Sequence, residues 1–230
     1  MHQSINKNKI YFYLIIILFL SSITNISIEK NLKDQLRIKY LKFSGIEENQ
    51  EIMIKQELEN IIGKNIFRVD KEYILKKLEQ FKYLEKINIH KKLPSELNIN
   101  LYITKIIGET YRNGKKYYVG ENKKFISSDN FQDVKKNPMI FGEFSADEYI
   151  NLLDELKNNN VEIKNIKNFF YHKSGRWDFQ NYSNEIILLP LNEYKNAIKL
   201  YKKFLNLDNK KKINSIDLRV KNQISLIYEK

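Results

Sequence analysis

Residues 81–101 read FKYLEKINIHKKLPSELNINL, and this stretch decides the fold of the first half of the chain. Ile87 and Ile89 alternate with polar neighbours before the Leu93-Pro94 pair. The same alternation resumes after that pair at Leu97, Ile99, Leu101 and Ile103. Successive side chains of a strand point to opposite faces, so each run predicts a strand with one apolar face. The proline between them predicts a turn, and the stretch is therefore expected to form two consecutive strands.

The preceding residues predict one strand at 38–43, IKYLKF, and two helices. The first helix is expected to begin at Asn49 and the second after Asp70, because both residue types cap helix N-termini. Apolar residues at helical spacing predict the buried faces: Ile54, Leu58, Ile61 and Ile62 before the stop at Gly63, then Ile74, Leu75, Leu78 and Phe81. A helix to Gln80 or Phe81 completes the order strand, helix, helix, strand, strand. This order is similar to that of a POTRA domain, with both helices on one face of a small sheet.

After Thr104 the pattern predicts a second α/β unit. A hairpin is expected at 117–127 and a loop at 138–142, and Ser145 with Glu148 forms a capping box that predicts a helix. Further elements follow at helical or alternating spacing: strands at 167–171, 176–180 and 185–189, and a helix after Asn192 with Tyr194, Ile198, Tyr201 and Leu205 on one side. The fold class is therefore α+β.

The chain is expected to end in a β-hairpin. Its first strand carries Ile216, Leu218 and Val220 on one face, and its second carries Ile224, Leu226 and Tyr228 on one face. A terminal strand is often a sheet edge, and an open edge offers unpaired backbone groups to a partner strand. On this reasoning, proline at Ser225 should remove an edge donor.

Residues 10–28 read IYFYLIIILFLSSITNISI and carry no charge. As a helix they would reach about 28 Å, close to the thickness of a hydrocarbon core. Ser22-Ile23-Thr24 also fits a signal-peptidase pattern, so a cleaved signal peptide is the alternative to an uncleaved anchor. The apolar character resumes beyond those small residues and favours the anchor. Lysines flank the stretch on both sides, so the charge distribution does not decide its orientation in the membrane. The short N-terminal tail and the long C-terminal body fit an inside-to-outside orientation.

The composition excludes several classes of function. The net charge is +12, but it is spread along the chain instead of forming the focused basic stripe of a nucleic-acid-binding protein. Without cysteine, neither a disulfide nor a thiolate metal site is possible, and His2, His90 and His172 lack ligand spacing. Ser27-Ile28-Glu29-Lys30 and Ser128-Asp129-Asn130 match two penicillin-binding motifs, but Lys-Thr-Gly is absent. We expect no enzymatic activity, no cofactor or metal, no nucleic acid and no small-molecule substrate.

Six stretches in order resemble the FtsQ (DivIB) family of cell-division proteins. They are IKYLKFSGI at 38–46, GKNIFRVD at 63–70, FKYLEKINIHKKLPSELNINL at 81–101, NPMIFGE at 137–143, SGRWDFQ at 174–180 and INSIDLRV at 213–220. The chain departs from the family in the last hairpin turn, where Lys221-Asn222-Gln223 lacks the usual glycine. The resemblance implies a cytoplasmic tail at 1–9, a transmembrane helix at 10–28, a linker at 29–36, a POTRA domain at 37–104 and a β domain at 105–230.

The resemblance also implies a function. Members of the family are single-pass inner-membrane proteins of the division septum with periplasmic C-terminal domains. They bind the small bitopic proteins FtsB and FtsL, work with other divisome components and link them to septal peptidoglycan synthesis. The expected partner-binding residues are Arg176, Arg219, Val220, Gln223, Ile224, Ser225, Leu226, Ile227 and Tyr228.

Three alternatives stay open at this point. Arg176 and Trp177 could anchor an interface, since both residue types dominate binding hot spots, or Trp177 could fill the core beside Phe169 and Phe179. A POTRA-bearing protein of outer-membrane assembly or secretion would bind extended segments by the same edge-strand pairing. A secreted binding module would result from cleavage after Thr24.

Overall fold

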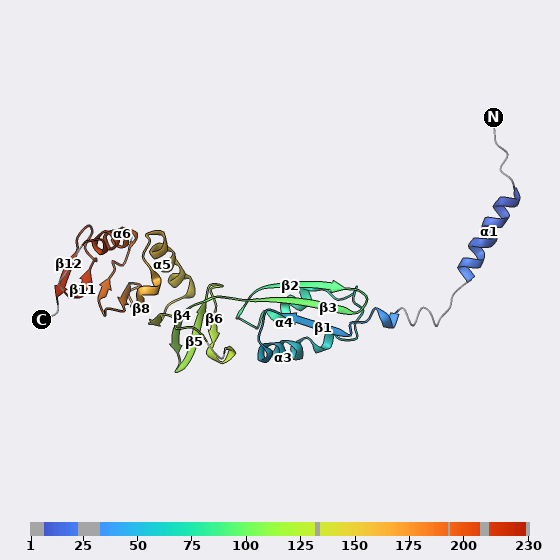
Figure 1. Cartoon of the computed structure of the whole chain (residues 1–230), viewed down its shortest axis with the longest axis horizontal. Helices are drawn as coiled ribbons and strands as arrows, with labels where there is room; N and C mark the ends of the chain where they lie inside the picture. The colour runs from blue at the N-terminus through green and yellow to red at the C-terminus, as the bar shows by residue number, and fades with distance from the viewer. Residues whose placement is uncertain (1–6, 23–32, 132–133, 193, 208–211, 229–230) are drawn as a thin grey trace, which may run out of the picture. The chain divides into compact units, whose positions relative to one another are not determined.

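The structure is a computed structural model of the whole chain. It describes residues 7–22, 33–131, 134–192, 194–207 and 212–228. The chain divides into two compact units, Met1–Leu78 with Ile87–Leu101, and Glu79–Lys86 with Tyr102–Lys230. Figure 1 shows the elements of both units in chain order.

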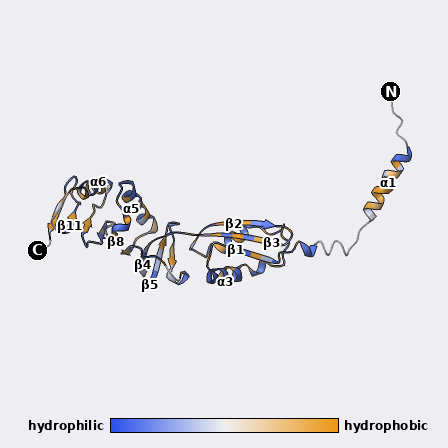
Figure 2. Cartoon of the chain, viewed as in Figure 1, coloured by the Kyte–Doolittle hydropathy of each residue, from blue (hydrophilic) through white to orange (hydrophobic). Residues whose placement is uncertain are grey.

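Helix α1 (Lys7–Ser22) is apolar on all sides from Ile10 to Leu20. Its side chains from Ile10 to Leu20 are exposed, and Figure 2 shows the same helix coloured as hydrophobic for most of its length. Within the described ranges, no helix combines the length and the apolar character that a membrane crossing needs. The predicted span at 10–28 is described only as far as Ser22, because residues 23–28 lie outside the described ranges.

The first unit has the predicted order of a POTRA domain. The elements in this order are β1 (Tyr40–Ser44), α3 (Glu48–Glu57), a 3-10 turn η1 (Glu59–Ile61), α4 (Lys71–Leu78), β2 (Leu84–Lys92) and β3 (Glu96–Ile103). The first three residues of β2 and the last two of β3 fall in the second unit. The described strands form a sheet in the order β1-β3-β2, in which β1 runs parallel to β3. Alternate residues of β3 are buried, as the sequence predicts, and so are Ile54, Leu58, Ile74 and Leu78 of the helical layer.

Three details of this unit differ from the sequence prediction. Helix α3 begins before Asn49, since Glu47 occupies the N-cap and its backbone N–H donates to Gln50 Oε1 over 3.2 Å. The helix also ends at Glu57, so Ile62 leaves the apolar stripe and is 43% exposed. Leu75 is 37% exposed at the rim of α4, which stops at Leu78. Asp70 does cap α4, because its Oδ1 accepts a hydrogen bond from the Glu72 amide.

The second unit is one mixed sheet of nine described strands with two helices on one face. The strands are β4 (Ile106–Arg112), β5 (Lys115–Gly120), β6 (Phe125–Ser127), β7 (Met139–Phe141), β8 (Ile166–Tyr171), β9 (Trp177–Asn181), β10 (Ile186–Leu188), β11 (Ile213–Asp217) and β12 (Ser225–Tyr228). Their order is β12-β11-β10-β9-β8-β7-β4-β5-β6. Helices α5 (Ala146–Asn158) and α6 (Tyr194–Leu205) share a core cluster with Ile140, Phe169, Phe179, Ile187 and Ile216 of the sheet.

The loop predicted at 138–142 is wrong. Met139–Phe141 forms β7, which lies inside the sheet and pairs in parallel with both β4 and β8. Three residues between Pro138 and Gly142 read locally as a loop, and two neighbouring strands override that local preference. Strand β4 was likewise not predicted. The hairpin β5–β6, the strands β8 to β10 and the capping box at Ser145 are confirmed.

Aromatic side chains fill the core between the sheet and the helices. Trp177 is 3% exposed and its ring packs against Phe144, Tyr149 and Tyr171, with centroid separations of 5.7, 5.9 and 4.7 Å. The core interpretation of Trp177 is therefore confirmed. The buried face of α6 includes Phe204, and the Leu205 predicted for that face is exposed instead.

Candidate protein-binding edge

The terminal hairpin predicted from the sequence is present, with a turn that needs no glycine. Strands β11 and β12 are antiparallel, with Asp217 opposite Ser225 and Ile216 opposite Leu226. Asn222 adopts φ +61°, the left-handed conformation that asparagine tolerates, and the Gln223 amide donates to the Val220 carbonyl over 3.2 Å. Asparagine thus takes the place of the family's glycine.

Val220 does not continue the strand that was predicted for it. Strand β11 ends at Asp217, Leu218 is still buried, and Val220 lies in the turn with 56% of its surface exposed. Its side chain is therefore available at the surface, but it does not belong to the alternating face of β11.

Strand β12 is an edge of the sheet, since its only neighbour among the described strands is β11. The Leu218 amide donates to the Leu188 carbonyl of β10 over 3.0 Å. Backbone groups alternate in direction along a strand, so the groups of Asp217 face β12 and those of Ile216 face β10. It follows that the Ser225 amide faces β11, whereas the N–H and C=O of Leu226 face the open edge. The expectation that Ser225 supplies an edge donor is wrong, and Leu226 takes that role.

The side chains of β12 divide between two faces. Ile224 and Leu226 pack against the core cluster on the side of the helices. Ser225 and Ile227 lie on the opposite face, where both are exposed. Tyr228 is also largely exposed. A strand added here would meet an apolar row on one face and a mixed row on the other.

The face opposite the helices carries a polar row that ends at this edge. The register places Asp178 of β9, Leu188 of β10, Asp217 of β11 and Ser225 of β12 side by side. Asp178 is buried and accepts a hydrogen bond from the Leu189 amide over 3.1 Å. The row therefore joins the edge strand to the carboxylate of Asp217 on the adjacent strand and to that of Asp178 three strands away on the same surface.

Arg176 is held by the buried carboxylate of this row. Its Nη2 lies 2.9 Å from Asp178 Oδ2, and the same oxygen lies 2.6 Å from His172 Nε2. The Nε of Arg176 is buried and has no hydrogen-bond partner among the described residues. Arg176 is thus partly a structural residue of the domain, with one donor still unused.

Arg219 forms a bidentate pair with Asp217. Arg219 Nε lies 2.9 Å from Asp217 Oδ1, and Nη2 lies 2.6 Å from Oδ2. The hydrogen bond from Arg219 is the largest cause that lowers the pKa of Asp217, and the positive charge of Arg176 lowers it further. The same pairing raises the pKa of Arg219. The two arginines predicted for the interface therefore act on one carboxylate next to the edge strand.

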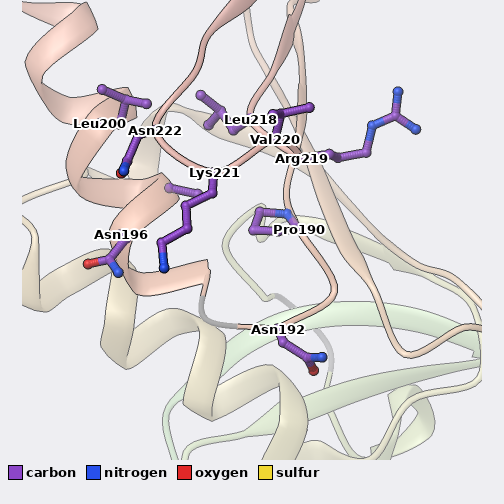
Figure 3. A pocket seen from close by; sticks show the side chains of 10 residues that line it. Pro190, Asn192, Asn196, Leu200, Leu218, Arg219, Val220, Lys221 and Asn222 are labelled. Atoms are coloured by element: carbon purple, nitrogen blue, oxygen red, sulfur yellow. The ribbon is translucent and has the colours of Figure 1, made fainter.

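A small hollow lies behind the hairpin turn and against α6. Its volume is about 240 Å³. It is lined by Pro190, Asn192, Asn196, Ala197, Leu200, Leu218, Arg219, Val220, Lys221 and Asn222. Figure 3 shows the Lys221 side chain reaching toward Asn196 while that of Arg219 points away. Leu200, Leu218 and Val220 are among its apolar lining residues, and none of its lining residues belongs to β12.

The structure brings together the residues that the sequence predicted for binding, and it adds others. Arg176, Arg219 and the strand Ser225–Tyr228 share one end of the sheet, with Val220 and Gln223 in the adjoining turn. Sequence reasoning missed His172, Asp178 and Asp217. His172 and Asp178 meet across the β8–β9 hairpin, and Asp217 joins them on one surface only through the register of β9, β10 and β11.

The order of strands and helices in the first unit defines a POTRA-bearing protein. Residues 36–102 match the family described as POTRA domain, FtsQ-type. No curated protein matches the chain. The domain match supports assignment of the chain to the FtsQ (DivIB) family, whose POTRA domain is a non-catalytic scaffold domain.

Proposed function

We propose that this protein is a divisome scaffold that captures an FtsB-like partner as an added strand on β12. The FtsQ-type POTRA domain indicates a role in cell division. The observation that carries the finer proposal is the outward-facing backbone of Leu226 at the edge of the sheet. Main-chain hydrogen bonds to this edge would give affinity, and the side chains on either face would give specificity. An FtsL-like protein and other divisome components would join through the bound partner.

The half-exposed Arg219–Asp217 pair beside the edge would help to position a partner segment. Its planar, bidentate geometry holds the guanidinium in one orientation next to an added strand. The unpaired Nε of Arg176 is buried and would not reach a partner. Val220 in the turn and Ile227 on β12 would supply exposed apolar contacts. The alternative, a protein of outer-membrane assembly or secretion, is not favoured by the FtsQ type of the POTRA domain.

We also propose that residues 10–28 anchor the protein in the inner membrane, with both units in the periplasm. A helix that is apolar on every side, as α1 is from Ile10 to Leu20, needs either a protein core or lipid around it. A reporter that is active only outside the cytoplasm, fused after Lys230, should be active in the membrane fraction. Recovery of a soluble mature chain that begins near Asn25 would instead establish a cleaved signal peptide.

The edge mechanism is tested by two substitutions at one position. Leu226→Pro removes the outward N–H but none of the amides that face β11, whereas Leu226→Ala keeps the N–H and removes the side chain. We expect Leu226→Pro to lower affinity for an FtsB-like partner by roughly tenfold or more and to produce filamentous cells. Leu226→Ala should retain more of that affinity. The readout is co-purification of the full-length protein from membranes.

The control is the fold of the second unit, reported by the fluorescence of the chain's single tryptophan. Equal partner binding by a folded Leu226→Pro variant and by the native chain would refute strand addition at this edge. The interface would then have to be sought around Arg176 or on the POTRA domain.

A further inference from the structure

A second charged feature lies in the first unit, on the loop that follows η1. Residues Gly63–Arg68 and the segment before β1 enclose an open hollow of about 580 Å³. Its lining consists of Lys33, Arg37, Gly63, Lys64, Asn65 and Arg68. Four of these six residues are cations, and none of the described lining residues is acidic. One of these cations, Arg37, is paired, with its Nε 3.0 Å from Asp34 Oδ1.

Backbone hydrogen bonds hold this loop in place. The Gly63 amide donates to the Ile38 carbonyl over 2.8 Å, and the Ile38 amide donates to the Lys64 carbonyl over 2.9 Å. The Ile66 amide donates to the Leu36 carbonyl over 2.9 Å, and its side chain is fully buried. The cations are therefore carried by a fixed scaffold, which lowers the entropy that binding would cost.

Two large apolar side chains stand exposed on the same loop. Ile62 precedes the cationic stretch, and Phe67, which is 61% exposed, lies between the buried Ile66 and Arg68. The Phe67 amide donates to Asn65 Oδ1 over 2.9 Å, and this turn directs the ring outward. A surface on which exposed apolar side chains alternate with cations is typical of proteins that bind to the interface of an anionic membrane.

The position of the hollow in the chain agrees with that chemistry. Lys33 follows the last residue of α1, Ser22, by eleven positions, which reach at most about 40 Å even when fully extended. If α1 belongs to the membrane anchor proposed above, the hollow cannot lie farther than this from the end of that helix. A nucleic acid or a soluble phosphate would use the cations but would leave the exposed Phe67 and Ile62 without a role.

We propose that this hollow binds the phosphate headgroups of anionic phospholipids, with Phe67 and Ile62 resting in the interface. The contact sets the POTRA domain against the membrane that anchors it. Each cation near an anionic surface favours contact by roughly fivefold. Lys64 and Arg68 together should therefore change the population of the bound state by about 25-fold.

The test uses the full-length chain in lipid nanodiscs made either of phosphatidylcholine alone or of phosphatidylcholine with phosphatidylglycerol. The chain has no cysteine, so Ile62→Cys can be labelled with an environment-sensitive fluorophore, and Gln56→Cys on the exposed side of α3 serves as the control position. We expect a blue shift and protection from acrylamide at position 62 only in the anionic discs. Protection should be lost in 0.5 M salt, because the contact is electrostatic.

Charge variants identify the hollow as the cause. K64E/R68E should abolish the protection, and K64Q/R68Q, which removes the charges without adding repulsion, should reduce it. The matched control K55E/K76E makes the same change in net charge at exposed positions of α3 and α4 outside the hollow, and it should keep the protection. Equal loss in K64E/R68E and K55E/K76E would overturn the proposal, because net charge alone would then explain the contact.

Lipid binding by the hollow rests on the proposed anchor, and co-elution with the two kinds of disc tests the two proposals separately. Failure of the chain to co-elute with phosphatidylcholine discs would reject the anchor. Co-elution with both kinds of disc, together with the same label environment at position 62 in both, would leave the anchor intact and refute lipid binding by the hollow.

Discussion

Replacing Leu78 with alanine should destabilise the POTRA domain selectively. Leu78 lies on α4 and is 0% exposed, so the substitution removes three fully buried carbon atoms. At about 0.8 kcal/mol for each buried methylene, their transfer is worth about 2.4 kcal/mol. A residual cavity of roughly 50 Å³ would add about 1.2 kcal/mol. We therefore expect the free energy of unfolding of this unit to fall by about 3–4 kcal/mol.

Hydrogen exchange can measure this loss within one unit of the full-length protein. Amides of β3 next to Leu97 and Ile99 exchange through unfolding of the POTRA domain, so their protection should fall by two to three orders of magnitude. Amides of β8 in the second unit should keep theirs. Tryptophan fluorescence would not serve, because Trp177 belongs to the second unit.

Leu75→Ala is the matched control. It makes the same chemical change on the same helix, but Leu75 is 37% exposed, and we expect a cost below about 1 kcal/mol. Similar losses at both positions would show that the helix is rotated from the orientation described here. A loss below about 0.5 kcal/mol for Leu78→Ala would refute the packed core itself.

Two further predictions concern the second unit and are measured by tryptophan fluorescence during chemical unfolding. Gly142→Ala should destabilise the unit by more than the roughly 1–3 kcal/mol of a strained backbone, because φ is +105° and an added Cβ would lie 2.1 Å from the Tyr171 carbonyl oxygen. Gly114→Ala, with φ +74° and open space around it, should cost only the strain. Hydrogen bonds from the Tyr171 hydroxyl and then the Ser145 amide hold the pKa of Glu148 below its ordinary value. The stabilisation that ionised Glu148 gives the folded unit is thus complete above the unfolded pKa of about 4.3, and it is lost as pH falls through the lower folded pKa. The difference in free energy of unfolding between the native protein and Glu148→Gln should therefore close below about pH 4. A gap that stays constant from pH 7 to pH 3 would contradict this account.

Features that depend on a few neighbouring residues could be predicted from the sequence. The capping box at Ser145, the cap at Asp70 and the alternation along β3 each involve residues within one or two turns or one strand. Errors appeared where an element ends, because spacing alone does not show where a helix stops. In the sequence, Ile62 continues the helical spacing of the apolar residues of α3, but the helix ends at Glu57.

Features that depend on partners far along the chain could not be predicted. Strand β7 has only three residues, and its strand conformation comes from pairing with β4 and β8 on either side. Nothing in the sequence NPMIFGE specifies those neighbours. The direction of the Ser225 amide is a similar case, since it follows from how β11 pairs with β10 and not from any property of Ser225.

The candidate edge combines both kinds of information. That the last strand would be open could be argued from its place in the chain, and the structure puts β12 at the end of the sheet. Which backbone groups face outward depends on one parallel pairing, that of β10 with β11. The same pairing sets Asp217 beside Leu188 and so brings Arg219 and the Arg176–Asp178 pair onto one surface. A shift of one residue in that register would turn the N–H and C=O of Leu226 toward β11 and would move the Asp217 side chain to the face that the helices cover. The open edge and its neighbouring charges therefore depend on a single strand alignment.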